Sequence, residues 1–185
     1  MKWHENRILA WVALALCVAI SVFGLGGFYL SRTRSRALAV FSGGADASQS
    51  VRHGVDAYLL GACESARIMA SEAEIHMGAS QLTQDVAAEA TTIGDGSASL
   101  AARQDAYDRL KAHVETLYSD FYTAASAEEF KNFKLACADF WGQDDLIRRD
   151  AYPALAHGYN RLIAGFPAGL VAALTGCGAL ATFGG

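Results

Sequence analysis

Asp144 and Asp145 form the pair of side chains in this sequence that most resembles acid–base machinery. Paired carboxylates can exchange protons with a substrate when both of them face the reacting group. Neighbouring residues of a helix point about 100° apart, however, so these two carboxylates do not share a face. Arg148 and Arg149 each follow one of them by four residues, which is the spacing of helix-stabilising ion pairs. The pattern therefore predicts two ion-paired helix positions and no catalytic pair.

The other side chains that could bind a metal or attack a substrate are scattered along the chain. They are His53, His76, His113, His157, Cys17, Cys63, Cys137 and Cys177. None of them forms an HxxxH, ExxH or CxxC spacing, which argues against a metal site and against a disulfide framework. The sequence also contains no GxxxxGK[ST] phosphate loop and no GxSxG nucleophile elbow. We therefore expect a protein that is not an enzyme and that needs no cofactor.

Tyr152, Tyr159 and Asn160 carry a different kind of chemistry, because tyrosine offers a large contact area at a low cost in conformational entropy. Tyrosine is also enriched among the residues that dominate protein–protein interfaces. The sequence leaves two roles open for these three side chains. Either they pack within the fold, with their hydroxyl groups hydrogen-bonded at the surface of a helical bundle, or they dock a partner protein. They are the candidate partner-docking residues of the chain.

The elements that must position these residues begin with an apolar run near the amino terminus. Residues 8–30, ILAWVALALCVAISVFGLGGFYL, contain no charged side chain. As a helix this run measures ~35 Å, which is enough for a hydrocarbon core of ~30 Å. Aromatic side chains, which favour the membrane interface, stand near its ends: Trp3, Trp11, Phe28 and Tyr29. Because a cleaved signal peptide has a shorter core of ~7–15 residues, we expect a single-pass, uncleaved anchor in the cell membrane, preceded by a tail of residues 1–7.

The charged residues give the anchor an orientation and narrow the set of partners. Three arginines follow the apolar run (Arg32, Arg34 and Arg36), whereas two basic residues precede it, and this excess favours a cytoplasmic body. Residues 1–36 hold five of the 15 basic and one of the 19 acidic residues, so the rest of the chain has a charge near −8. That charge repels phosphate backbones and argues against nucleic acid as a partner. We expect the lipid bilayer and other membrane or membrane-associated proteins as partners, and oligomerisation stays open.

The body is predicted to begin with a long helix after a juxtamembrane linker of residues 31–47. Asp46 or Ser48 is suited to the N-cap, because a short oxygen-bearing side chain can accept a free backbone N–H. Small or apolar residues then recur every three or four positions, on one helix face: Val51, Val55, Tyr58, Ala62, Ala66, Met69 and Ala73. We expect this helix to continue past Gly78 as far as Ala90, with an end at Gly78 as the alternative, and to be followed by a turn in residues 91–99.

Two further apolar stripes predict two more long helices. The second helix carries Leu100, Tyr107, Leu110, Val114, Leu117 and Phe121, and the third carries Phe130, Phe133, Cys137, Phe140, Ile147, Ala151 and Leu155. Ser126 and Glu129 form a capping-box signature before the third helix, and Pro153 should kink that helix because it lacks a backbone donor. Long helices with short connections indicate an antiparallel bundle. The predicted fold is all-α, a single amino-terminal transmembrane helix followed by an antiparallel bundle of long helices in residues 48–185.

The chain ends with an uncharged stretch that runs from Leu162 to Gly185. Glycines and Pro167 interrupt it, and its uninterrupted apolar part, residues 170–174, is too short to cross a membrane. We expect residues 170–183 to fold back and bury themselves as an apolar cap on the bundle. A second membrane span and an association with the bilayer surface are the alternatives.

A motif in the last part of the chain resembles a known family. It consists of Arg149, Tyr152, Tyr159-Asn160, Ile163, Phe166-Pro167, Leu170, Ala173, Gly176 and Phe183. In this order, residues 149–183 resemble the carboxyl end of the LemA family of bacterial membrane proteins, although Tyr152-Pro153 stands where the family has a Tyr-Asn pair. The resemblance is looser over the rest of the chain. It implies an amino-terminal transmembrane helix and a helical scaffold near membrane-protein remodelling or assembly, with no catalytic residues to carry over.

Three functions from different classes follow. The leading hypothesis is a membrane-anchored helical scaffold or interaction protein of the LemA type, which organises other proteins at the membrane. An alternative is an accessory subunit or weak hydrolase that uses Asp144, Asp145 and a histidine from another helix. A pocket that gathers His113 or His157 with Asp144 would favour this alternative. The third hypothesis is a membrane-stress sensor that works through the apolar tail.

Overall fold

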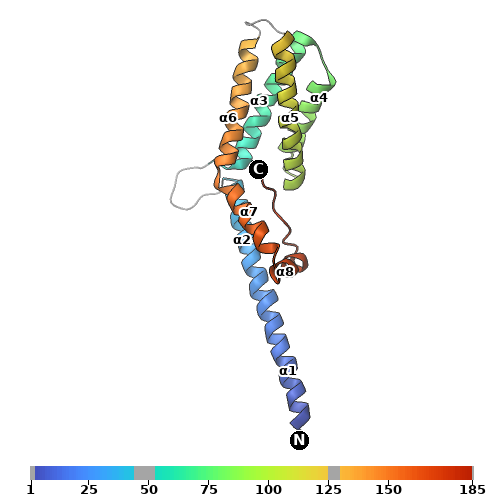
Figure 1. The fold of residues 1–185 in the computed structure, drawn as a ribbon, viewed down its shortest axis with the longest axis vertical. Coiled ribbons are helices and arrows are strands. Elements are labelled where there is room, and N and C mark those ends of the chain that lie inside the picture. Colours follow the sequence, from blue (N-terminus) through green and yellow to red (C-terminus); the bar gives the residue numbers. More distant parts are fainter. Residues whose placement is uncertain (1–2, 44–52, 125–129, 185) are drawn as a thin grey trace. The chain divides into compact units, whose positions relative to one another are not determined.

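The computed structural model describes residues 3–43, 53–124 and 130–184 (Figure 1). Helices make up most of this part of the chain, and it contains no strand, which confirms the predicted all-α fold. The chain divides into two compact units. Unit 1 comprises residues 1–38 and 155–180, and unit 2 comprises residues 39–154 and 181–185. Unit 1 therefore joins the anchor to residues 155–180, which the sequence assigns to the body.

The amino-terminal apolar helix is built from three consecutive helical elements. They are α1 (Trp3–Ile20), the π-helix η1 (Ser21–Leu25) and α2 (Gly26–Phe41). Within the described residues, this is the one helix long and apolar enough to cross a membrane, over Leu9–Phe41. It continues through residues 31–41, where a linker was expected, because that segment contains no glycine or proline and is rich in arginine and alanine, which favour helices.

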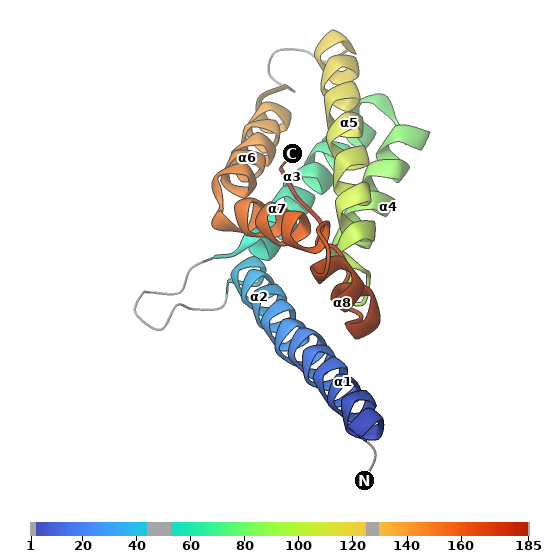
Figure 2. The ribbon, with the colours of Figure 1, turned by 60° about the horizontal axis from the view of Figure 1, so that its bottom comes forward.

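Unit 2 contains the predicted helical bundle. Its helices are α3 (Val55–Met77), α4 (Gln81–Gly94), α5 (Leu100–Ala124) and α6 (Phe130–Arg149). Figure 2 shows α3 between α6 on one side and α4 with α5 on the other, and α3 packs mainly against α6 and α4. Most described residues of the predicted stripes lie in its core, although Tyr58, Leu100 and Phe130 are only half-buried and Ala151 is exposed. The largest fully buried side chains include Met69, Tyr107, Leu110, Leu117, Phe121, Phe133 and Phe140 from the stripes, and Leu59 and Ile93, which the stripes did not contain.

The first body helix ends at Gly78, so the expectation that it continues to Ala90 is wrong. Gly78 has a φ of 86°, a backbone conformation that favours glycine at the end of a helix. Ser80 then starts α4 by accepting a hydrogen bond from the Thr83 N–H at 3.2 Å. The Ser80 N–H in turn donates to the Thr83 hydroxyl oxygen at 3.2 Å, which completes a capping box. The bundle therefore has four helices in the described residues of unit 2, not three.

The third predicted helix is also divided, but not at Pro153. The chain bends at Asp150 and resumes as α7 (Ala151–Ile163), whose Tyr152 N–H donates to the Asp150 carboxylate at 2.8 Å. Pro153 lies in the first turn of α7, where a backbone donor has no partner within the helix and its loss costs little. The Ser126–Glu129 capping box and the N-cap candidates Asp46 and Ser48 lie outside the described residues.

In unit 1, a short helix packs against the anchor. This helix, α8 (Ala168–Thr175), lies against the start of α2, where a Cβ added to Gly27 would lie 3.2 Å from Thr175 Cγ2 and one added to Gly26 would lie 3.8 Å from Val171. Small residues let two helix backbones approach closely. Gly176, with a φ of 69°, ends α8 and turns the chain into its last segment.

Candidate functional site

The last segment of the chain, residues 177–183, has no regular secondary structure and is called the tail segment here. In unit 1, the Tyr159 hydroxyl donates to the Cys177 carbonyl at 2.7 Å. The Asn160 side-chain amide donates to the Leu180 carbonyl and accepts from the Leu180 N–H, both at 2.8 Å. Asn160 therefore satisfies the backbone of Leu180 in both directions, as a neighbouring strand would. Burial raises the pKa of Tyr159, so its hydroxyl keeps the proton that it donates.

In unit 2, the end of the tail segment is held in the same way. The Tyr152 hydroxyl donates to the Ala181 carbonyl at 2.8 Å. The Gln104 side chain accepts from the Thr182 N–H at 2.9 Å and donates to the Thr182 carbonyl at 3.4 Å. The Phe183 ring is fully buried, and its centroid lies 5.5 Å from that of Phe41. These contacts fix the chain end between side chains of α2, α5 and α7.

The three candidate partner-docking residues thus all hold the chain's own tail segment. Tyr152 is fully buried, Tyr159 is 2% exposed, and Asn160 is half-buried. These contacts correspond to the packing role that the sequence left open for them. Docking of a separate partner by these side chains stays a prediction.

The expected apolar cap is only partly formed. Cys177, Leu180, Ala181 and Phe183 are buried, in agreement with a tail that folds back onto the protein. The residues of α8 behave differently, since Leu170 is 49% and Leu174 67% exposed. α8 therefore buries only its Val171–Ala172 side, and the tail segment supplies the other buried residues of the cap.

Sequence reasoning missed Gln104 and Arg103, two long polar side chains at the start of the α5 stripe. Arg103 is 7% exposed, and its Nε donates to the Ile93 carbonyl at 2.7 Å. Its guanidinium also pairs with the Asp56 carboxylate and lies over the Phe41 ring, 5.5 Å from the centroid. The sequence did contain a signal for them, because both interrupt an apolar helix face. Polar side chains at such positions are buried together with hydrogen-bonding partners.

The carboxylate pair is ion-paired as predicted. Arg148 contacts Asp144 at 2.8 Å, and Arg149 contacts Asp145 at 2.9 Å. Asp144 is 3% exposed, and its other oxygen accepts a hydrogen bond from the Tyr107 hydroxyl at 3.0 Å. Burial, followed by the negative charge of Asp144, raises the pKa of Tyr107, so this hydroxyl stays a donor. Both Asp144 oxygens are therefore engaged in a structural network.

His113 and His157 were the candidate partners of Asp144 in an acid–base site. His113 is half-buried on α5, six residues and so about 9 Å along the helix from Tyr107, the tyrosine that contacts Asp144. His157 is exposed on α7 and belongs to unit 1. Within the ranges that the structure describes, no group of three or more His, Cys, Asp or Glu side chains could hold a metal ion.

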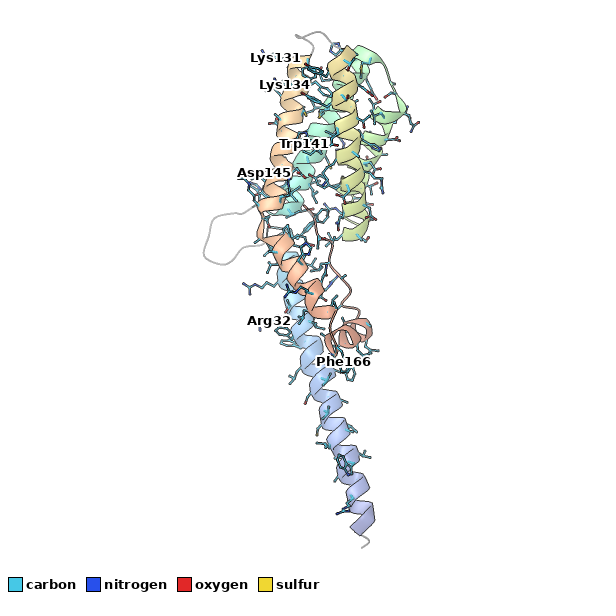
Figure 3. The ribbon with its side chains drawn as sticks, in the orientation of Figure 1. Arg32, Lys131, Lys134, Trp141, Asp145 and Phe166 are labelled. Carbon is cyan, nitrogen blue, oxygen red and sulfur yellow. The ribbon has the colours of Figure 1, made fainter. Side chains whose placement is uncertain are left out.

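A groove separates the middle parts of α5 and α6. Its volume is about 350 Å³, and its lining residues are Glu115, Tyr118, Lys134, Cys137, Ala138 and Trp141. Figure 3 labels Lys134 and Trp141 on α6. At one end of the two helices, stacked aromatic rings close the gap, with the Phe121 and Phe133 centroids 4.3 Å apart. The groove thus combines an apolar, aromatic lining with one acidic and one basic residue.

A smaller cavity lies within unit 1, beside the anchor. Its volume is about 230 Å³, and its lining residues are Ser21, Val22, Gly26, Tyr29, Leu30, Leu162, Pro167, Ala168 and Val171. None of these side chains is charged, so this cavity suits an apolar occupant. Comparison with protein-family models, with curated proteins and with solved structures finds no match to the chain.

Proposed function

We propose that the protein is a membrane-anchored helical scaffold of the LemA type, which holds other membrane or membrane-associated proteins at the bilayer. The observation that carries this proposal is the exposure of the apolar side chains on the amino-terminal helix. They include Leu9, Trp11, Val12, Leu14, Leu16, Val18 and Ile20, which are 53% to 70% exposed. A core helix of a soluble protein would bury such side chains against its own fold.

Transferring the apolar side chains of this helix from water into lipid lowers the free energy. Burying one such apolar side chain is worth roughly 1.5–3 kcal/mol relative to leaving it in water. Hydrocarbon supplies that burial over the whole run, because the helix satisfies its own backbone hydrogen bonds. With Arg32, Arg34 and Arg36 at its carboxyl end, we place the anchor once across the cell membrane and the body in the cytoplasm.

The groove between α5 and α6 supports the scaffold part of the proposal. Tyr118 and Trp141 are half-buried there, and both residue types are enriched at the centres of protein interfaces. A groove between two helices suits the apolar face of a partner helix, while Glu115 and Lys134 would select its charged residues. Burial raises the pKa of the Cys137 thiol, which keeps this lining residue uncharged.

The residues of the motif that resembles the LemA family make contacts with one another and with the tail segment. Tyr152, Tyr159 and Asn160 belong to the motif, and each holds the backbone of the tail segment. Phe183, another motif residue, packs against Tyr152 with their ring centroids 6.4 Å apart. The motif residues therefore act together on one structural task. No observation favours the weak hydrolase, since both Asp144 oxygens already have partners.

Photo-crosslinking from neighbouring positions of α6 tests the scaffold proposal. A photoreactive amino acid at Ala138 faces the groove, whereas one at Asp139 lies on the next residue, about 100° around the helix. In intact cells, we expect position 138 to crosslink to a discrete membrane-associated protein and position 139 to do so far less. Equal crosslinking at both positions, or none at position 138, would remove the groove as the docking site.

A further inference from the structure

The short helix α8 presents apolar side chains that nothing in unit 1 covers. Phe166, which precedes it and is labelled in Figure 3, is 90% exposed. Within α8, Leu170 and Leu174 are four residues apart and so share one exposed face, while Val171 and Ala172 are buried. No charged residue occurs between Leu162 and the end of the chain. In water, this row would be an unusual exposed apolar patch on a soluble surface.

The position of α8 along the anchor indicates what covers this row. α8 packs against Gly26 and Gly27, inside the apolar run of the spanning helix. Arg32, the first charged residue after that run, lies five residues beyond Gly27, or about 7.5 Å along the helix. Interfacial helices bury their apolar faces ~5–10 Å into the boundary between headgroups and acyl chains. The contact with the anchor holds α8 at that depth.

We propose that α8 lies in the membrane interface beside the anchor, with Phe166, Leu170 and Leu174 in contact with lipid acyl chains. This inference rests on the proposed membrane anchor, and it adds a second lipid-contacting element. α8 cannot cross the bilayer, because its eight residues span about 12 Å. It can lie in the bilayer, because a helix satisfies its own backbone groups and the Thr175 hydroxyl bonds to the Val171 carbonyl at 2.8 Å.

Two further features of unit 1 fit a lipid environment. Arg161, an exposed residue in the last turn of α7, is the last charged residue before the apolar stretch, and Arg32 is the first charged residue after the anchor's apolar run. Cations at these two points favour the headgroup region, where anionic lipids lie.

The cavity of about 230 Å³ between η1, α2 and α8 is smaller than the ~300–1,000 Å³ of a drug-sized ligand site. Its apolar lining suits a single acyl chain that fills the space beside α8.

Spin labels on the full-length chain in phosphatidylcholine vesicles test the inference. The four native cysteines are replaced by alanine, and helix content is compared with that of the native chain by circular dichroism. Single labels are then placed at Leu174 (L174C), at Leu14 in the apolar run (L14C) and at Leu135 on α6 (L135C), which are 67%, 53% and 59% exposed. The collision rates of each label with molecular oxygen and with a water-soluble nickel chelate are measured.

We expect the ratio of oxygen to nickel collisions to be several-fold higher at Leu174 and at Leu14 than at Leu135. A ratio at Leu174 equal to that at Leu135, with a high ratio at Leu14, overturns the place of α8 in lipid and leaves the anchor intact. Low ratios at both Leu174 and Leu14 overturn the anchor itself. An immobile label at Leu174 that neither probe reaches means that protein covers α8, which also overturns the inference.

A photoreactive phospholipid gives a second measurement that needs no substitution. With a diazirine on its acyl chain, it should label the unaltered protein in the peptide that contains residues 166–174 as well as in the anchor. We expect no label in the peptide that contains Leu135. Labelling confined to the anchor would contradict the inference even if the cysteine-free chain fails to fold.

Discussion

α8 and the tail segment are adjacent in the sequence, uncharged and similar in composition, yet they differ in secondary structure and in burial. α8 forms a regular helix and leaves Leu170 and Leu174 exposed, whereas the tail segment is irregular and buries Leu180 and Phe183. A helix carries its own backbone hydrogen bonds, so it can face hydrocarbon or water without further partners. An irregular segment can be buried only where other side chains bond its backbone.

The side chains that bond the tail segment therefore determine where the apolar end of the chain goes. Tyr159 and Asn160 hold residues 177–180, and Tyr152 and Gln104 hold residues 181–182. None of these four side chains belongs to the apolar stretch itself. Hydrophobicity alone does not separate a segment that is buried in protein from one that is exposed for lipid.

The largest expected effect on stability comes from replacing one phenylalanine by alanine in the tail segment, compared with the same replacement beside α8. Phe183→Ala removes a fully buried ring and should lower the free energy of unfolding by ~3–5 kcal/mol. Phe166→Ala removes a ring that is 90% exposed and should change it by less than ~0.5 kcal/mol. Thermal unfolding of the full chain in lipid nanodiscs, followed by circular dichroism, measures both. Equal losses would show that the two phenylalanines share one environment.

The next effect concerns the polar side chains that hold the tail segment. Asn160→Ala leaves the backbone N–H and carbonyl of Leu180 without partners and should cost ~1–3 kcal/mol of stability. Asn132→Ala, on the exposed surface of α6, is the matched control and should cost little. Limited proteolysis should also cleave the carboxyl-terminal end of the Asn160→Ala chain sooner. An unchanged cleavage rate would mean that Asn160 does not hold the segment.

The sequence predicted the helices better than it predicted these contacts. Helical periodicity is local, so the stripes of α3, α5 and α6 were recognisable, and the uncharged run of residues 8–30 indicated a helix of spanning length. The break at Gly78 could also have been predicted from nearby residues. Ser80, capped by a hydrogen bond with Thr83, marks the start of a new helix. The apolar pattern gave the wrong answer, because apolar residues still recur every three or four positions beyond Gly78, at Val86, Ala90 and Ile93.

The contacts of the tail segment could not be read in this way. Gln104 and Thr182 are 78 residues apart, and Tyr152 and Ala181 are 29 residues apart. Which polar side chain meets which backbone group depends on how α5 and α7 are placed, and periodicity does not specify that placement. The apolar composition of residues 170–183 was equally compatible with burial and with exposure, which is why α8 was assigned to the cap.

A smaller effect compares the two faces of α8. Val171 is 2% exposed and contacts the start of α2, so Val171→Ala should cost about 1.6 kcal/mol, at ~0.8 kcal/mol for each lost carbon. Leu174→Ala should cost less than ~0.5 kcal/mol in nanodiscs, although leucine loses more atoms. Lipid surrounds position 174 whether or not α8 is docked, so docking gains little from that side chain. A larger loss at Leu174 than at Val171 would mean that protein covers the outer face.

The smallest expected effect on stability depends on pH. It involves Tyr159, a titratable side chain that holds the tail segment, whereas α8 has no titratable side chain. Tyr159→Phe removes the hydrogen bond to the Cys177 carbonyl and should cost about 1 kcal/mol at neutral pH. Because burial raises the pKa of Tyr159 in the folded protein, the unfolded chain loses this proton first as the pH rises. The contribution of Tyr159 is therefore complete below the ordinary tyrosine pKa of ~10 and declines above it.

The difference in stability between the native chain and Tyr159→Phe should accordingly be constant from pH 7 to about 9 and shrink at higher pH. Tyr107, whose pKa burial also raises, is present in both chains, so its titration cancels in the difference. Tyr122→Phe, at a tyrosine that is 67% exposed, should show no such trend and serves as the control. Within α8 no side chain titrates, so Leu174→Ala should be independent of pH over the same range. A difference for Tyr159→Phe that grows above pH 10 would mean that its hydroxyl is ionised in the folded protein and does not hold the tail segment.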